Sequence, residues 1–190
     1  MNFQKILIVI TLLTVSQNCF SNEKLSKDLD NDNIKDQIIF DKKNAQIICK
    51  LSTQNFLPIR SQKLEYLNDT AGIQSTKNGF QFYNHSMRLG YYCQFRYNPT
   101  EKKIELIGMS RYNLGNVMQD GSGESSVNLL TKKYIGEWIR FNEKAQKHVK
   151  LPTIYKPYNI DKVYLEGFSV KQPDDFVAFC DNLRNKIVYK

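Results

Sequence analysis

The sequence predicts a mainly β protein: an antiparallel β-rich single domain with a C-terminal α-helix packed on one face. Three observations lead to this prediction. Short runs rich in isoleucine and aromatic residues occur repeatedly between residues 37 and 142. Turn signals containing Asn, Gly, Pro and Lys separate these runs. Only the segment from residue 173 onward shows a sustained helical period.

The expected strands follow one another along the chain. QIIFDK and AQIICKL read as a first hairpin, and NGFQFYN and MRLGYYCQFRYN follow with high aromatic density. The turn NPTEKK leads into IELIGMS as the clearest hairpin, and SSVNLLT is expected to pair with YIGEWIRFN through a tight turn. Trp138 in the last of these strands is expected to place a large aromatic side chain in the core.

The C-terminal helix is expected to begin near Pro173, because proline is favoured in a first helical turn. Asp174 and Asp175 complement the positive end of the helix dipole, and Arg184 and Lys186 complement the negative end. The helical period predicts one apolar stripe that faces the sheet, made of Phe176, Phe179, Cys180, Leu183 and Ile187.

Residues 1–21 have the pattern of a secretory signal peptide. Lys5 precedes a short apolar stretch, about half as long as the roughly 20 residues that span a bilayer. We expect cleavage after Ser21, so that residues 22–190 form one exported domain, periplasmic or secreted, without stable membrane insertion. Cys19 leaves open a lipid-modified alternative, against which the preceding Asn18 argues.

Export changes the interpretation of the cysteines, because oxidising compartments favour disulfides. Cys49 and Cys93 both lie in strand-like segments and are predicted to form a disulfide bond with each other. Cys180 lies on the apolar stripe of the helix and is expected to be a core residue. A nucleophilic pair of Cys93 and His85 would instead require Cys93 to be a free thiol.

An aspartate-rich segment, SKDLDNDNIKDQIIF, precedes the first expected strand. It resembles the calcium loop of FG-GAP and related adhesin-type repeats, in which aspartates at alternate positions lead directly into an apolar strand. The resemblance implies a calcium site, and Asn33 stands where the pattern usually has glycine. The alternative is a solvated acidic segment without an ion. The implied ligands are Asp28, Asp30, Asp32, the backbone of Ile34, and Asp36.

The remaining composition excludes several kinds of chemistry. Two histidines without neighbouring ligands argue against zinc. The formal net charge of +8 suits an anionic or acidic partner, but export argues against nucleic acid. The basic segments TKKYIG and KAQKHVK are interpreted as sheet edges that lysine protects from association.

The segment 113–126 is polar, rich in glycine and long, which is more typical of a functional or mobile loop than of a simple connection. A disordered surface loop is the alternative. We therefore expect a non-catalytic binding protein whose partner is a protein of the cell envelope. Small exported proteins of this kind are similar to bacterial immunity and inhibitor proteins, which implies a toxin as the partner. The expected contact residues are Arg111, Tyr112, Asn113, Asp120, Ser122 and Glu124.

An envelope enzyme is the alternative expectation. A glycan or peptidoglycan hydrolase requires two carboxylates, and Glu124 and Glu137 are the pair that the sequence offers.

Overall fold

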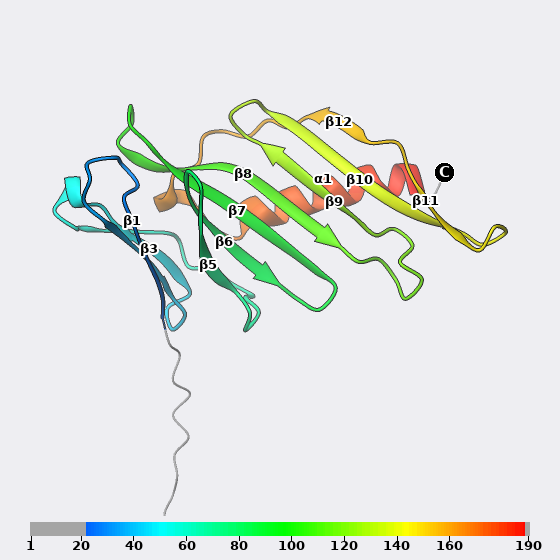
Figure 1. Ribbon diagram of the computed structural model, residues 1–190, viewed down its shortest axis with the longest axis horizontal. Helices are drawn as coiled ribbons and strands as arrows, with labels where there is room; N and C mark the ends of the chain where they lie inside the picture. Colours follow the sequence, from blue (N-terminus) through cyan, green and yellow to red (C-terminus); the bar gives the residue numbers. More distant parts are fainter. Residues whose placement is uncertain (1–21, 189–190) are drawn as a thin grey trace, which may run out of the picture.

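A computed structural model, which describes residues 22–188, contains two antiparallel sheets and one long helix (Figure 1). The smaller sheet has the strand order β1-β2-β3-β4. Ile38 and Phe40 on its second strand point into the core, as the alternation of that strand requires. Its strands are β1 (Glu23–Lys27), β2 (Asp36–Asp41), β3 (Gln46–Lys50) and β4 (Pro58–Arg60), and the short helix η1 (Ser52–Gln54) follows β3.

The larger sheet is a meander in which each strand pairs with the next along the chain, in the order β11-β10-β9-β8-β7-β6-β5. A further strand, β12, pairs with the first part of β10, whereas β11 pairs with the last part. The strands are β5 (Gly72–Thr76), β6 (Gly79–His85), β7 (Leu89–Asn98), β8 (Lys103–Asn113), β9 (Gly123–Asn128), β10 (Lys133–Asn142), β11 (Lys147–Lys150) and β12 (Ile154–Pro157).

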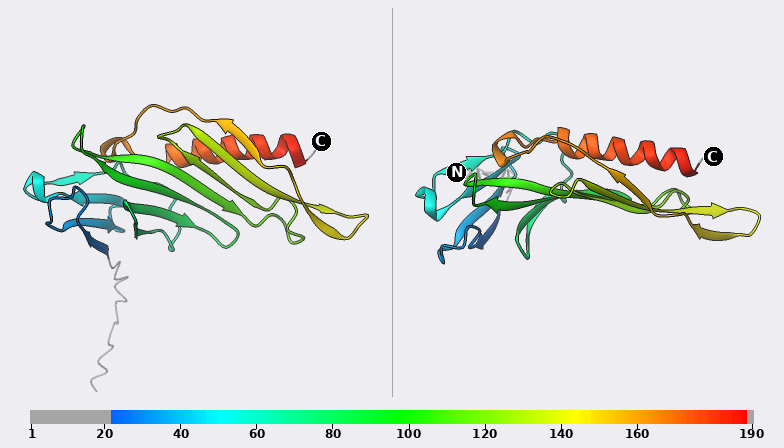
Figure 2. Two further views of the ribbon diagram at one scale, coloured as in Figure 1. Left: turned by 45° about the horizontal axis from the view of Figure 1, so that its top comes forward. Right: turned by 90° about the horizontal axis from the view of Figure 1, so that it is seen from above.

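The chain then passes through the short helix η2 (Leu165–Gly167) into α1 (Lys171–Val188), which lies along one face of the larger sheet (Figure 2). Phe176 and Cys180, on the side of the helix that faces the sheet, are fully buried. The rings of Tyr134 and Tyr158 pack edge-on against Phe179 at centroid distances of 5.1 and 4.9 Å. Phe176, Phe179, Cys180 and Leu183 of the predicted helical stripe therefore pack in the core, and the side chain of Ile187 lies outside the described part of the chain.

One hydrophobic core joins the two sheets and the helix. Phe40 of the smaller sheet meets Phe82 of the larger sheet at a centroid distance of 5.5 Å. Phe82 in turn contacts Phe168, which follows η2. Trp138 is fully buried, as expected. The predicted fold class, a β-rich architecture with a C-terminal helix on one face, is confirmed.

The predicted disulfide between Cys49 and Cys93 does not form. Cys49 lies on β3 and Cys93 on β7, in different sheets, and both are free thiols buried in the core, as is Cys180. Burial raises the pKa of the Cys49 and Cys93 thiols, and it raises the pKa of Cys180 to about 11. Within residues 22–188 these cysteines act as small apolar side chains that fill the core.

Two sequence-based predictions fall on residues 1–21, namely the signal peptide and the modification of Cys19, and lie outside the described part of the chain. Between residues 22 and 188 there is no helix with the length and hydropathy needed to cross a membrane.

Candidate functional site: the uncovered face of the larger sheet

The face of the larger sheet opposite α1 carries no other element over strands β7 to β10 among the described residues (Figure 2). Alternation along the strands sends every second side chain to this uncovered face. The strand register aligns these side chains in rows across the sheet. One row runs through six strands and consists of Tyr83, Tyr92, Ser110, Ser126, Ile135 and Tyr155.

The middle of this row is a shallow trough. Ser110 and Ser126 are small, whereas Tyr92 stands on one side of them and Ile135 on the other. The resulting concave surface has a volume of about 320 Å³. Tyrosine and serine on an open sheet offer ring faces and hydroxyl groups without a large cost in side-chain entropy, a combination found in the antigen-binding loops of antibodies.

The neighbouring row contains His85, Gly90, Tyr112, Glu124 and Glu137. The His85 ring lies at the centre of an aromatic cluster, with centroid distances of 4.9 Å to Tyr83, 4.7 Å to Tyr92 and 5.6 Å to Tyr112. Burial lowers the pKa of His85, so the neutral ring is favoured.

Gly90 makes this cluster sterically feasible. A Cβ atom at position 90 would lie 2.7 Å from His85 Cδ2 and 2.8 Å from Tyr112 Cε1. Both distances are shorter than any normal carbon–carbon contact. The glycine therefore lets the two rings meet above the backbone of β7, and the aromatic cluster depends on it.

Glu124 and Glu137, the carboxylates proposed for hydrolysis, occupy directly opposed positions on β9 and β10. Glu137 accepts hydrogen bonds from Lys150 Nζ over 2.9 Å and from Thr153 Oγ1 over 3.2 Å. The hydrogen bond from Lys150 lowers the pKa of Glu137. A glycosidase acid must hold its proton near neutral pH, and these contacts make Glu137 unsuited to that one role.

Arg111, predicted as a contact for a partner, belongs to the opposite face of the sheet. Its guanidinium is buried under α1, where it donates to the Val177 carbonyl over 2.9 Å and forms an ion pair with Asp181 over 2.9 Å. Adjacent residues on a strand point to opposite faces, so Tyr112 lies on the uncovered face and Arg111 cannot. Arg111 therefore anchors the helix.

The other predicted contact residues also differ in how far a partner could reach them. Glu124 is exposed on the uncovered face. Asn113 Oδ1 accepts the N–H of Gly115, and Asp120 Oδ1 accepts the N–H of Phe141 over 2.7 Å. Ser122 is buried and pairs with Ile139 through its backbone. These three residues hold the loop in place, and they present little to a partner.

The loop itself is shorter than the sequence predicted, because β8 extends to Asn113 and β9 begins at Gly123. The Arg88 guanidinium donates to the carbonyls of Leu114, Gly115 and Asn116, which joins the loop to the β6–β7 turn. His148 Nε2 lies 2.9 Å from the Met118 carbonyl oxygen. The exposed apolar side chains at this end of the sheet are Met87, Leu89, Leu114, Val117 and Met118.

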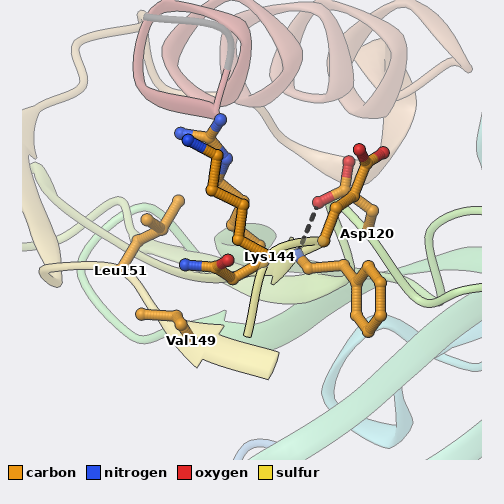
Figure 3. A pocket seen from close by; sticks show the side chains of 8 residues that line it. Asp120, Lys144, Val149 and Leu151 are labelled. Carbon is orange, nitrogen blue, oxygen red and sulfur yellow. Dashed lines mark hydrogen bonds between the residues drawn. The ribbon is translucent and has the colours of Figure 1, made fainter. Parts of the chain in front are cut away.

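A second hollow, of about 590 Å³, lies beside the β10–β11 hairpin (Figure 3). Asp120 stands on one side of it, and Val149 and Leu151 stand on the other. The Asp120 carboxylate is occupied by the N–H of Phe141. The lining of the hollow mixes Arg140 and Lys144 with carboxylates and apolar groups, so the hollow favours no one class of ligand.

The aspartate loop forms a separate group at the other end of the molecule. Ligand oxygens of Asp28, Asp30 and Asp36 all lie within 4.8 Å of one another, so this group could hold a metal ion. Asp32 is not part of this group: its carboxylate accepts hydrogen bonds from Ser52 Oγ over 2.6 Å and from the Ile34 N–H over 2.8 Å. Those hydrogen bonds lower the pKa of Asp32. The backbone carbonyl of Ile34 stays a predicted ligand.

The loop curls through two left-handed residues, Asn31 with φ 64° and Asn33 with φ 67°. Asparagine tolerates this conformation better than most residues, so Asn33 can replace the glycine of the resembled pattern. The carboxylate of Asp28 accepts the N–H groups of both asparagines. The loop is therefore closed by its own side chains.

Asp30 differs from the other two aspartates. Its Oδ1 atom is buried without a hydrogen-bond partner among the described residues, whereas the Asp36 carboxylate accepts the N–H groups of Leu29 and Ser52. Burial, together with the nearby Asp36 and Asp32 carboxylates, raises the pKa of Asp30. An orphaned carboxylate oxygen facing like charges fits a cation.

Sequence reasoning missed most of the uncovered face, namely Tyr83, Tyr92, Ser126, Ile135 and Tyr155. Their alternation within strands was a visible signal, but the row emerges only from the pairing register of six strands. Comparison with known proteins finds no family model, no curated protein and no solved structure that matches this chain.

Proposed function

We propose that this protein is an exported, non-catalytic binding protein that engages a protein of the bacterial cell envelope through the uncovered face of its larger sheet. A toxin that the protein neutralises is the partner class that fits its proposed location. The observation that carries the proposal is the row of tyrosine, serine and isoleucine side chains on a face that the protein's own helix leaves open.

The chemistry of the face supports binding over catalysis. Tyrosine is enriched in the energetically dominant parts of protein interfaces. The apolar residues at the loop end of the sheet, including Met87 and Val117, extend the surface on which a partner can lie. The alternative, a glycan hydrolase using Glu124 and Glu137, requires one carboxyl with a raised pKa, and the ion pair with Lys150 makes Glu137 unsuited to be that acid.

Filling the trough tests the proposal. Ser126 is an exposed small residue at its centre, so Ser126→Arg should block the face without disturbing the core. The control is Asn182→Arg, an exposed position on α1. We expect affinity capture from envelope extracts to retain a partner with the wild type and with Asn182→Arg, and to lose it with Ser126→Arg. Equal capture by all three proteins would remove the face from the account.

We further propose that the aspartate group binds calcium, with Asp28, Asp30 and Asp36 as its carboxylate ligands. Calcium prefers carboxylate and carbonyl oxygens, and loops of this kind in extracellular proteins bind it with dissociation constants of about 10⁻⁴ to 10⁻³ M. The buried, unpartnered oxygen of Asp30 is the observation that supports this site. The ion would connect the N-terminal loop to the smaller sheet and would take no part in recognition.

A further inference from the structure

We propose that the edge strand β12 and the groove beside it bind an extended, acidic segment of the partner as an added β-strand. This inference rests on the proposed function and deepens it, because it names the chemistry of the partner at one end of the same face. β12 has an open backbone edge, and the groove beside it has an apolar floor and three lysines at its rim.

The backbone of β12 is open on one side. Within residues 22–188, β12 pairs with β10 alone. The Tyr158 N–H donates to the Lys132 carbonyl over 2.9 Å, so by alternation Tyr134 and Lys156 form the next hydrogen-bonded pair, and Ile135 and Tyr155 form a pair without hydrogen bonds. The N–H and C=O groups of Tyr155 therefore point outward, where another strand can accept and donate hydrogen bonds.

The groove next to this edge has an apolar floor. It encloses about 610 Å³ and is lined by Ile135, Tyr155 and Pro157 among other residues. Ile135 is 40% exposed and Tyr155 is 70% exposed, although they are cross-strand neighbours. Two large apolar side chains left open on one row provide a contact for alternate side chains of an added strand.

Three lysines surround the groove: Lys132, Lys133 and Lys156. All three are exposed, and none forms an ion pair with a side chain that the structure describes. Lysines at an edge strand discourage pairing with a second copy of the same chain, because like charges would meet. The same lysines attract a strand that carries carboxylates, so the edge is selective for acidic partners.

Two matched peptide probes test this inference on the full mature chain. One is a seven-residue peptide in which glutamate alternates with valine and phenylalanine, and the other replaces each glutamate by lysine. We expect the acidic peptide to shift NMR signals of β10 and β12, to protect the Tyr155 amide from hydrogen exchange, and to bind at least tenfold more tightly than the basic peptide.

The variant Lys133→Glu/Lys156→Glu should reverse this preference, whereas the control Lys63→Glu/Lys77→Glu, with exposed lysines outside the groove, should keep it. Equal affinity of the two peptides, binding of neither, or shifts confined to other strands would overturn the inference. A different pattern would also overturn it: neither peptide binds, the wild type binds phosphatidylglycerol vesicles, and Lys133→Glu/Lys156→Glu does not. The groove would then bind an anionic lipid surface.

The two proposals can fail separately. Partner capture that depends on Ser126 while neither peptide binds would leave the proposed function standing and remove the strand addition. If the acidic peptide binds at β12 but Ser126→Arg still captures the partner, the groove remains a strand-binding site. The proposal that the partner binds across the uncovered face would then be contradicted.

Discussion

Asp30 is the residue whose surroundings most favour a bound cation. Its Oδ1 atom is buried and unpartnered in the described chain, and its pKa is raised by burial and by neighbouring carboxylates. A raised pKa means that the folded protein binds the proton of Asp30 more tightly than the unfolded chain does. Without metal, the free energy of unfolding therefore falls as the pH rises from the usual pKa of aspartate through the raised pKa of Asp30. A bound cation should remove this loss of stability.

We predict that calcium stabilises the wild type, and that Asp30→Asn abolishes this response while raising the metal-free stability at pH 7. At a calcium concentration ten times the dissociation constant, the free energy of unfolding should increase by about 1.4 kcal/mol. Urea denaturation with calcium or with a chelator measures both effects. Asp161→Asn, at an exposed position outside the loop, is the control. A calcium response that survives in Asp30→Asn would exclude this site.

The aspartate loop also shows what spacing can and cannot predict. The spacing correctly placed Asp28, Asp30 and Asp36 around one point, because alternate residues of a curling loop point inward. It could not foresee that Ser52, from the segment after β3, would donate to Asp32 and keep it out of the group. That contact depends on chain segments far apart in the sequence.

At the scale of elements, the attachment of α1 decides which face of the larger sheet stays open. Arg111 reaches from β8 to Asp181 and to the Val177 carbonyl on α1. The guanidinium groups of Arg111 and Arg184 both lie over the Trp138 ring, at 5.7 and 5.8 Å from its centroid. This polar contact under the helix fixes the helix position more specifically than apolar packing alone.

We predict that Asp181→Ala lowers the free energy of unfolding by about 3 kcal/mol, because Arg111 would keep a buried, unpaired charge. Asp175→Ala is the matched control on the same helix, since it removes an exposed ion pair with Lys171 and a favourable charge near the helix N-terminus, and should cost about 1 kcal/mol or less. Chemical denaturation of both variants measures the difference. Equal costs would mean that Arg111 is not the anchor described here.

Strands that the sequence did not predict share a common feature. β1, β4, β5 and β12 are short, and many of their exposed residues are polar. Their pairing with longer strands gives them their structure, because isolated segments of this composition have weak strand propensity. The long strands β7, β8 and β10 were predicted because their aromatic and branched residues face a core.

For the molecule as a whole, the sequence was sufficient to predict the fold class, the covering helix and the burial of Trp138 and Cys180. It was not sufficient to predict the strand register, since register depends on pairing between segments far apart in the chain. The register brings Tyr92, Ser126 and Ile135 into one surface. The prediction that Arg111 contacts a partner was wrong for a related reason. Neighbouring residues of a strand point to opposite faces, so Tyr112 lies on the open face and Arg111 on the covered one.

The open face also fits the electrostatics of the whole molecule. A protein with a formal net charge of +8 attracts acidic partners over a long range. The uncovered face is divided, with Glu124 and Glu137 in one row and Lys133 in another. Such a surface orients a partner as well as attracting it, which suits specific binding to one protein.

Binding through the uncovered face is tested by the dissociation constant of the captured partner, measured by titration calorimetry for the wild type, Tyr112→Ala and Tyr66→Ala. Tyr112 lies on the uncovered face, whereas Tyr66 is an exposed tyrosine in the segment between β4 and β5. The account predicts that Tyr112→Ala, checked to be folded, weakens binding at least about tenfold and that Tyr66→Ala leaves it unchanged. Unchanged binding by Tyr112→Ala, or an equal loss in both variants, would contradict it.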